Sequence, residues 1–131
     1  MPLSSIELRD LPFTPIQGFL TGFATVSPAS GTVLGGMIAP TPATIRYVVA
    51  AAAAGGTTTV LDVLNNGVSI WTNPADRPTL TGAASGRFVS GRINRSAVRV
   101  GDIVELVVAT AGNKARLVAT VALEDPSQRA G

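Results

Sequence analysis

The chain contains no cysteine and no histidine among its 131 residues. The lack of cysteine excludes disulfides and thiolate nucleophiles, and the lack of histidine excludes Ser-His-Asp catalysis and the usual zinc and haem ligand sets. Stability must therefore come from packing, from hydrogen bonds between strands or from oligomerisation. Any catalysis would have to use carboxylates, and we expect a protein that is not an enzyme and holds no cofactor or metal.

Charged residues are also scarce, at 14% of the chain, against about 25% in an average soluble domain. Either small polar residues keep such a surface in solution, or other protein covers part of it. The net charge of +2 lacks the excess that gives a nucleic-acid binder its basic face. No apolar run approaches the roughly 20 residues that span a bilayer. We therefore expect neither nucleic acid nor a membrane as partner.

What the chain does contain is a strong hairpin signal over residues 57–72. Two runs of β-branched and aliphatic residues flank Asn65-Asn66-Gly67. Asn and Gly adopt positive φ at low steric cost, and tight hairpin turns require this. The pattern predicts a hairpin whose second strand covers 68–72.

Short β-type runs separated by turn residues recur along the rest of the chain. The expected strands are 19–26, 32–39, 43–53, 57–64, 68–72, 87–93, 103–110 and 115–123. Strict alternation in the third of them would place Ile45, Tyr47 and Val49 on one face. The last two strands are expected to pair as a second hairpin around 111–114.

About eight strands at this spacing predict an all-β fold, an antiparallel jelly-roll-like β-sandwich. The expected organisation is an extended N-terminal arm over residues 1–17, the sandwich domain over 18–123 and a polar C-terminal tail over 124–131. No basic segment followed by an apolar core opens the chain, so no signal peptide is expected.

Two turn motifs carry a family resemblance. Residues 61–70 read Leu-Asp-Val-Leu-Asn-Asn-Gly-Val-Ser-Ile, and residues 100–106 read Val-Gly-Asp-Ile-Val-Glu-Leu. With this order of motifs, residues 43–123 resemble small jelly-roll modules of tailed bacteriophage virions, which serve as capsid cement or decoration proteins and as parts of head or tail fibres. The chain has no fibre shaft repeat, which favours the cement protein over the fibre module.

The resemblance implies a structural virion protein, often a homotrimer, on the capsid exterior. Its expected partners are the major capsid protein and other copies of itself, and it would be made in the host cytoplasm. A cement protein stabilises the capsid by bridging neighbouring capsid subunits. The resemblance supplies no catalytic residue.

Two segments are candidates for the capsid or subunit interface. The arm has the prolines and scattered apolar residues of an extended segment that lies on its own domain or on a neighbour; its candidates are Leu3, Ile6, Leu8, Leu11, Phe13 and Ile16. The window between Asp76 and Asp102 has no acidic residue and contains Arg87, Arg92, Arg95 and Arg99. Because Arg bonds carboxylates in a bidentate manner, these residues either dock on acidic capsid loops or are simply solvated.

Four further residues have alternative interpretations. Asp62 lies between apolar neighbours and is expected to pair with turn amides or with an Arg such as Arg46. Asp102 is expected to close a turn through its side chain. Trp71 and Tyr47 either pack in the core or an interface, or form an aromatic platform for sugar. The platform would suit the alternative function, a receptor- or glycan-binding module of a phage fibre.

Overall fold

The computed structural model describes residues 16–24, 28–53, 55–81, 86–89, 92–114 and 116–124. The arm candidates Leu3, Ile6, Leu8, Leu11 and Phe13 lie outside the described residues, as does the side chain of Ile16. Within these ranges the chain forms ten strands and one short 3-10 helix. They are β1 (Ile16–Ala24), β2 (Val33–Ile38), β3 (Ala43–Ala52), β4 (Thr59–Asn65), β5 (Val68–Ser69), η1 (Pro74–Asp76), β6 (Thr79–Leu80), β7 (Gly86–Val89), β8 (Ala97–Val98), β9 (Ile103–Thr110) and β10 (Leu117–Glu124).

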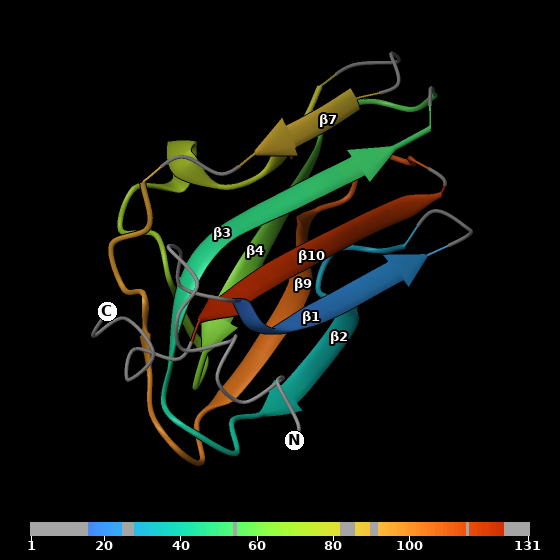
Figure 1. The fold of residues 1–131 in the computed structure, drawn as a ribbon. Coiled ribbons are helices and arrows are strands. Elements are labelled where there is room, and N and C mark those ends of the chain that lie inside the picture. Colours follow the sequence, from blue (N-terminus) through green and yellow to red (C-terminus); the bar gives the residue numbers. More distant parts are fainter. Residues whose placement is uncertain are drawn as a thin grey trace, which may run out of the picture.

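The strands form two antiparallel sheets that pack as a sandwich (Figure 1). The first, here called the β10 sheet, has the order β1-β10-β3-β7, with β8 also paired to β3. The second, the β9 sheet, has the order β2-β9-β4-β5, with β6 also paired to β4. The long strands alternate between the sheets along the chain, as expected for two interleaved Greek keys. The predicted all-β, jelly-roll-like sandwich is confirmed.

The core lies between the two sheets. Alternate residues of the long strands point inward, as the period-two pattern requires. Val48 and Val121 from the β10 sheet and Leu61 and Leu106 from the β9 sheet are fully buried.

The hairpin expected within residues 57–72 is present as β4 and β5. Asn66 and Gly67 occupy the turn with φ of 52° and 82°, the positive values that Asn and Gly tolerate best. The second strand is shorter than expected and ends at Ser69. Beyond it Ile70 and Trp71 turn into the core and are buried.

The prediction that residues 103–110 and 115–123 pair as a second hairpin is wrong. β9 pairs with β2 and β4, whereas β10 pairs with β1 and β3, so the two strands belong to different sheets. The connecting segment crosses between the sheets because it is bonded to the loop that precedes β4. Thr57 N–H donates to Gly112 O at 2.6 Å, and Lys114 Nζ donates to Gly55 O at 3.1 Å.

The strict alternation expected in β3 is also wrong, because the strand contains a β-bulge. Ala122 is opposite Tyr47, but the next residue, Leu123, is opposite Ile45, so Arg46 is an extra residue. A bulge shifts the facing of every residue on one side of it. Ile45 is therefore buried although Tyr47, two residues on, faces solvent. The outer face of the sheet gains an aromatic side chain in this way.

Candidate interaction surfaces

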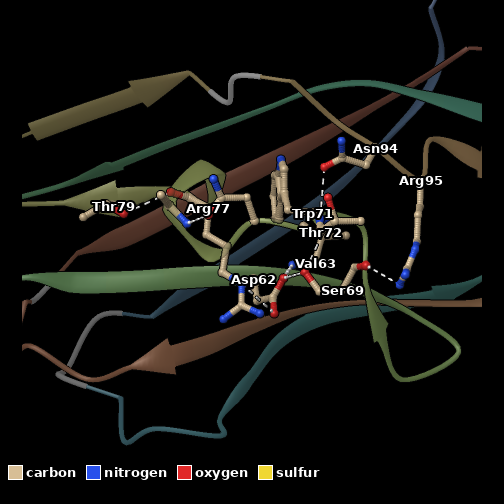
Figure 2. Close-up of polar contacts among 11 residues, drawn as sticks. Asp62, Val63, Ser69, Trp71, Thr72, Arg77, Thr79, Asn94 and Arg95 are labelled. Atoms are coloured by element: carbon tan, nitrogen blue, oxygen red, sulfur yellow. Dashed lines mark hydrogen bonds and ion pairs between the residues drawn. The ribbon is translucent and has the colours of Figure 1, made fainter.

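Asp62 is the centre of a polar cluster on β4 that Figure 2 shows in close-up. Its side chain is almost completely buried. Oδ1 accepts hydrogen bonds from Val63 N–H at 2.8 Å and from the Ser69 hydroxyl at 2.7 Å. Oδ2 lies 3.3 Å from Nε of Arg77. Burial of a carboxylate is costly unless it is paired and hydrogen-bonded, and these three groups meet that need.

The pairing of Asp62 is thus as expected, but the identity of the arginine is not. Arg46 bonds to the buried carboxylate of Glu124 at 3.0 Å, at the other side of the sandwich. Among the described residues no three carboxylates gather into a group that could hold a metal ion. The contacts of Asp62 explain its burial as structural pairing.

Trp71 packs in the core, as one of its two interpretations expected. It is 2% exposed, and its backbone N–H donates to the Ser69 hydroxyl oxygen at 3.2 Å, beside Asp62. Tyr47 lies on the outer face of the β10 sheet and is 37% exposed. A sugar-binding platform needs aromatic faces that are accessible together, and these two residues do not share a surface.

Asp102 joins the two turn motifs that the sequence singled out. Its Oδ2 accepts from Arg99 N–H at 2.8 Å, which closes the turn as expected, and from Asn65 Nδ2 at 3.2 Å. Its Oδ1 accepts from Asn66 Nδ2 at 3.0 Å. Asn66 Oδ1 in turn accepts from Ile103 N–H at 2.9 Å. The hairpin turn and the Gly-Asp turn are therefore hydrogen-bonded to each other at one end of the sandwich.

These hydrogen bonds lower the pKa of Asp102, and the bond from Arg99 N–H is the largest cause. A carboxyl whose pKa is lower in the folded chain than in the unfolded chain stabilises the fold above the unfolded pKa. That stabilisation is lost as pH falls through the folded value. We expect the melting temperature of wild type to fall more than that of Asp102→Ala between pH 7 and a pH below the ordinary value of 3.8.

Thermal unfolding followed by circular dichroism at the two pH values measures this difference. Asp76→Ala is the control, because the Asp76 carboxylate lies outside the network of Asp102. Equal pH sensitivity in wild type and Asp102→Ala would show that the network contributes nothing to acid stability.

The four candidate arginines form a strip rather than a compact cluster. Arg87 lies in β7 opposite Ala51, whereas Arg99 follows β8, which pairs with the start of β3 at Ala43. Their separation along β3 is roughly 25 Å at the rise of a β-strand. Arg92, Arg95 and Arg99 are exposed. We call this strip, made of Arg87, Arg92, Arg95 and Arg99, the arginine edge.

A further surface, which sequence reasoning did not single out, covers the outer face of the β10 sheet. Its large side chains are exposed although they are apolar or aromatic: Phe19 (59%), Phe23 (69%), Tyr47 (37%) and Val118 (45%). The pairing registers place the residues of this face in three rows across β1, β10 and β3: Phe23-Val118-Ala51, Thr21-Thr120-Val49 and Phe19-Ala122-Tyr47. We call these nine residues the Phe face; eight of them are at least partly exposed, and Ala122 is fully buried. None of them is charged.

The Phe face has a hollow on the side of β7. A shallow, mostly apolar depression of about 330 Å³ is lined by Val49, Ala51, Val118 and Thr120 of the Phe face, together with Ala50, Phe88 and Ala119. The signal for this surface was present in β1, where Phe19 and Phe23 alternate with Leu20 and Gly22. A strand that is apolar on both faces is typical of one covered on both sides.

The fold and these surfaces define an all-β jelly roll with an uncharged apolar face and an arginine edge. No family model matches the sequence, and no curated protein matches it. The resemblance to phage virion modules therefore rests on the two turn motifs. A membrane-crossing helix does not occur among the described residues, where the one helix, η1, is three residues long.

Proposed function

We propose that this protein is a non-enzymatic structural protein of a bacteriophage virion, a capsid cement or decoration protein. It binds the outer surface of the capsid and stabilises it by bridging neighbouring capsid subunits. The observation that carries this proposal is the Phe face. Contiguous apolar patches of several hundred Å² on a soluble domain mark surfaces that contact other protein. The scarcity of charge and the phage-like turn motifs support the same function.

Contact with the major capsid protein is assigned to the arginine edge and the arm. Arg makes charge-assisted, bidentate bonds to carboxylates, so a strip with Arg92, Arg95 and Arg99 exposed fits a row of acidic loops on the capsid surface. The part of the arm that precedes β1, residues 1–15, would add apolar area at roughly 25 cal/mol per Å² before ordering costs are subtracted. Several such contacts in one oligomer combine through avidity, so each of them can be weak.

The protective effect follows from these contacts. A molecule that binds across the boundary between two capsid subunits must be released before the subunits separate. Bridging therefore raises the free energy needed to open the shell against the pressure of packaged DNA. A receptor- or glycan-binding role is the alternative, but Trp71 and Tyr47 give it no shared aromatic surface.

Binding to capsids tests the proposal directly. We expect purified protein to cosediment with expanded capsids that lack it, and to raise the temperature at which those capsids break. Arg92→Glu is expected to weaken binding about tenfold, because it places a like charge against acidic loops. The matched control is Arg116→Glu, which makes the same charge change at an exposed position next to β10.

The salt dependence of capsid binding separates this contact from apolar binding. Screening weakens contacts between exposed charges most, so added salt should weaken binding through the arginine edge. Failure of the wild-type protein to bind capsids at low salt would overturn the proposal. So would capsids that resist heat equally well with and without it.

A further inference from the structure

We propose that the Phe face is the surface through which copies of this chain associate, so that a second copy covers it. The inference deepens the proposed function, because it names the surface that joins the subunits of the cement protein. It concerns the protein in solution, however, and holds or fails in the absence of a capsid.

The exposed area of the Phe face fits the needs of a subunit interface. From their exposed fractions, Phe19, Phe23, Tyr47 and Val118 together present about 400 Å² of largely apolar surface, if a fully exposed aromatic side chain contributes about 200 Å². A standard interface buries about 800 Å² per partner, of which somewhat more than half, about 450 Å², is apolar. One face of one sheet thus supplies nearly the whole apolar share.

The charge distribution favours a second copy as the occupant. Two identical surfaces repel each other if they carry net charge, and the nine residues of the Phe face carry none. Of the charged residues next to the face, Arg46 is paired with Glu124 at 3.0 Å, and Arg87 follows Ala51 in the row of Phe23, on the edge strand β7. The arginine edge, by contrast, has one sign throughout and would repel its own copy. Self-association therefore fits the Phe face, and an acidic partner fits the arginine edge.

The relief of the face provides a knob and a hollow. Among the large apolar side chains that the structure describes, Phe23 is the most exposed, at 69%. Val118, the cross-strand partner of Phe23, and Ala51, the next residue of the same row, line the depression. Aromatic side chains that fill pockets carry most of the binding energy in protein interfaces. A neighbouring copy that places its Phe23 in this depression buries both features at once.

A second apolar surface lies on the outer face of the β9 sheet. By the same criteria it is less suited to a subunit interface than the Phe face. Ile38 and Ile103 are opposite each other there and are 67% and 47% exposed. Glu105 pairs with Gly36 in the same two strands, so a charge stands close by. The surface has no aromatic side chain on β2 or β9. Ile38 therefore serves as a control with almost the same exposure as Phe23.

The test measures the mass of the full-length protein in solution. Sedimentation equilibrium or light scattering over a wide dilution series is applied to wild type, Phe23→Ser, Phe19→Ser and Ile38→Ser. We expect wild type to form a discrete oligomer. Each Phe variant should dissociate at a concentration about tenfold higher or more, because it removes a central aromatic anchor. Ile38→Ser should associate as wild type does.

All three changes are at exposed positions, and circular dichroism checks that each variant is folded. The use of two Phe variants keeps the test decisive if one of them misfolds. A wild-type protein that is monomeric at every concentration overturns the inference, as does an oligomer that Ile38→Ser weakens and both Phe variants leave intact. A monomer that still binds capsids would refute this inference alone, whereas an oligomer that ignores capsids would refute only the proposed function.

Discussion

Replacement of Gly112 by alanine is expected to lower the free energy of unfolding by about 3 kcal/mol or more. A Cβ at this position would collide with the carbonyl oxygens of Thr57 and Thr58. Both of those atoms belong to the backbone of the neighbouring loop, so no side chain can rotate away to relieve the collision. Either the loops separate and the bond from Thr57 N–H to Gly112 O is broken, or the crossing to β10 shifts. Urea unfolding followed by circular dichroism measures the loss.

Gly18→Ala is the control for this change. A Cβ on Gly18 meets nothing within 4 Å, and a surface substitution of this kind changes stability by less than about 0.5 kcal/mol. Both variants lose the conformational freedom of glycine, but only Gly112→Ala introduces the collision. The difference between them therefore measures the effect of the collision. If the two alanine variants unfolded at the same urea concentration, the close contact of the two loops would not be a source of stability.

Gly112 also explains why one part of the fold was predicted from the sequence and another was not. The turn at Asn66 and Gly67 depends on the conformational preferences of the turn residues themselves, so a local pattern was sufficient. The path after β9 depends on a contact between Gly112 and Thr57, which are 55 residues apart. Alternation in β9 and β10 showed that each has a buried face, but not which strand lies beside it. The predicted boundaries of β9 were therefore right, but the prediction that it pairs with β10 was wrong.

The bulge in β3 is a second feature beyond the reach of a local pattern. Arg46 carries no sign in the sequence that it is an extra residue, since a continuous β-strand would accept it equally well. The bulge becomes visible only through the pairing of β3 with β10. It brings Tyr47 to the outer face, where Tyr47 completes the row that begins with Phe19. The composition of the Phe face thus depends on the pairing of strands that are distant in the sequence.

The candidate surfaces were predictable to different degrees for the same reason. The arginines were visible as a run without acidic residues, but their separation along the edge follows from β7 and β8 pairing with opposite ends of β3. The exposure of Phe19 and Phe23 was not visible, because a strand with two apolar faces gives no sign of which face the chain itself covers. Only the sandwich shows that Leu20 faces the core and that Phe23 is left outside.

Asp62→Ala is expected to cost about 2–3 kcal/mol, the second large effect. The change leaves the Ser69 hydroxyl and Val63 N–H without the acceptor they share at 2.7 and 2.8 Å. It also leaves the guanidinium of Arg77, whose side chain is only 26% exposed, without its carboxylate. A buried group that loses its partner costs more than the pair contributes when intact. Urea unfolding measures the loss, with Asp76→Ala as the control.

The origin of this loss can be isolated by removing Arg77 as well. If the cost of Asp62→Ala comes largely from the charge left behind on Arg77, the double variant Asp62→Ala/Arg77→Ala should lose clearly less stability than the sum of the single variants. Losses that add would mean that the two side chains act independently and that the 3.3 Å contact between them contributes no coupling. In that case the hydrogen bonds from Ser69 and Val63 would account for the burial of Asp62. The double-mutant cycle therefore distinguishes an ion pair from a hydrogen-bonded carboxylate as the element that holds the hairpin and the loop after it together.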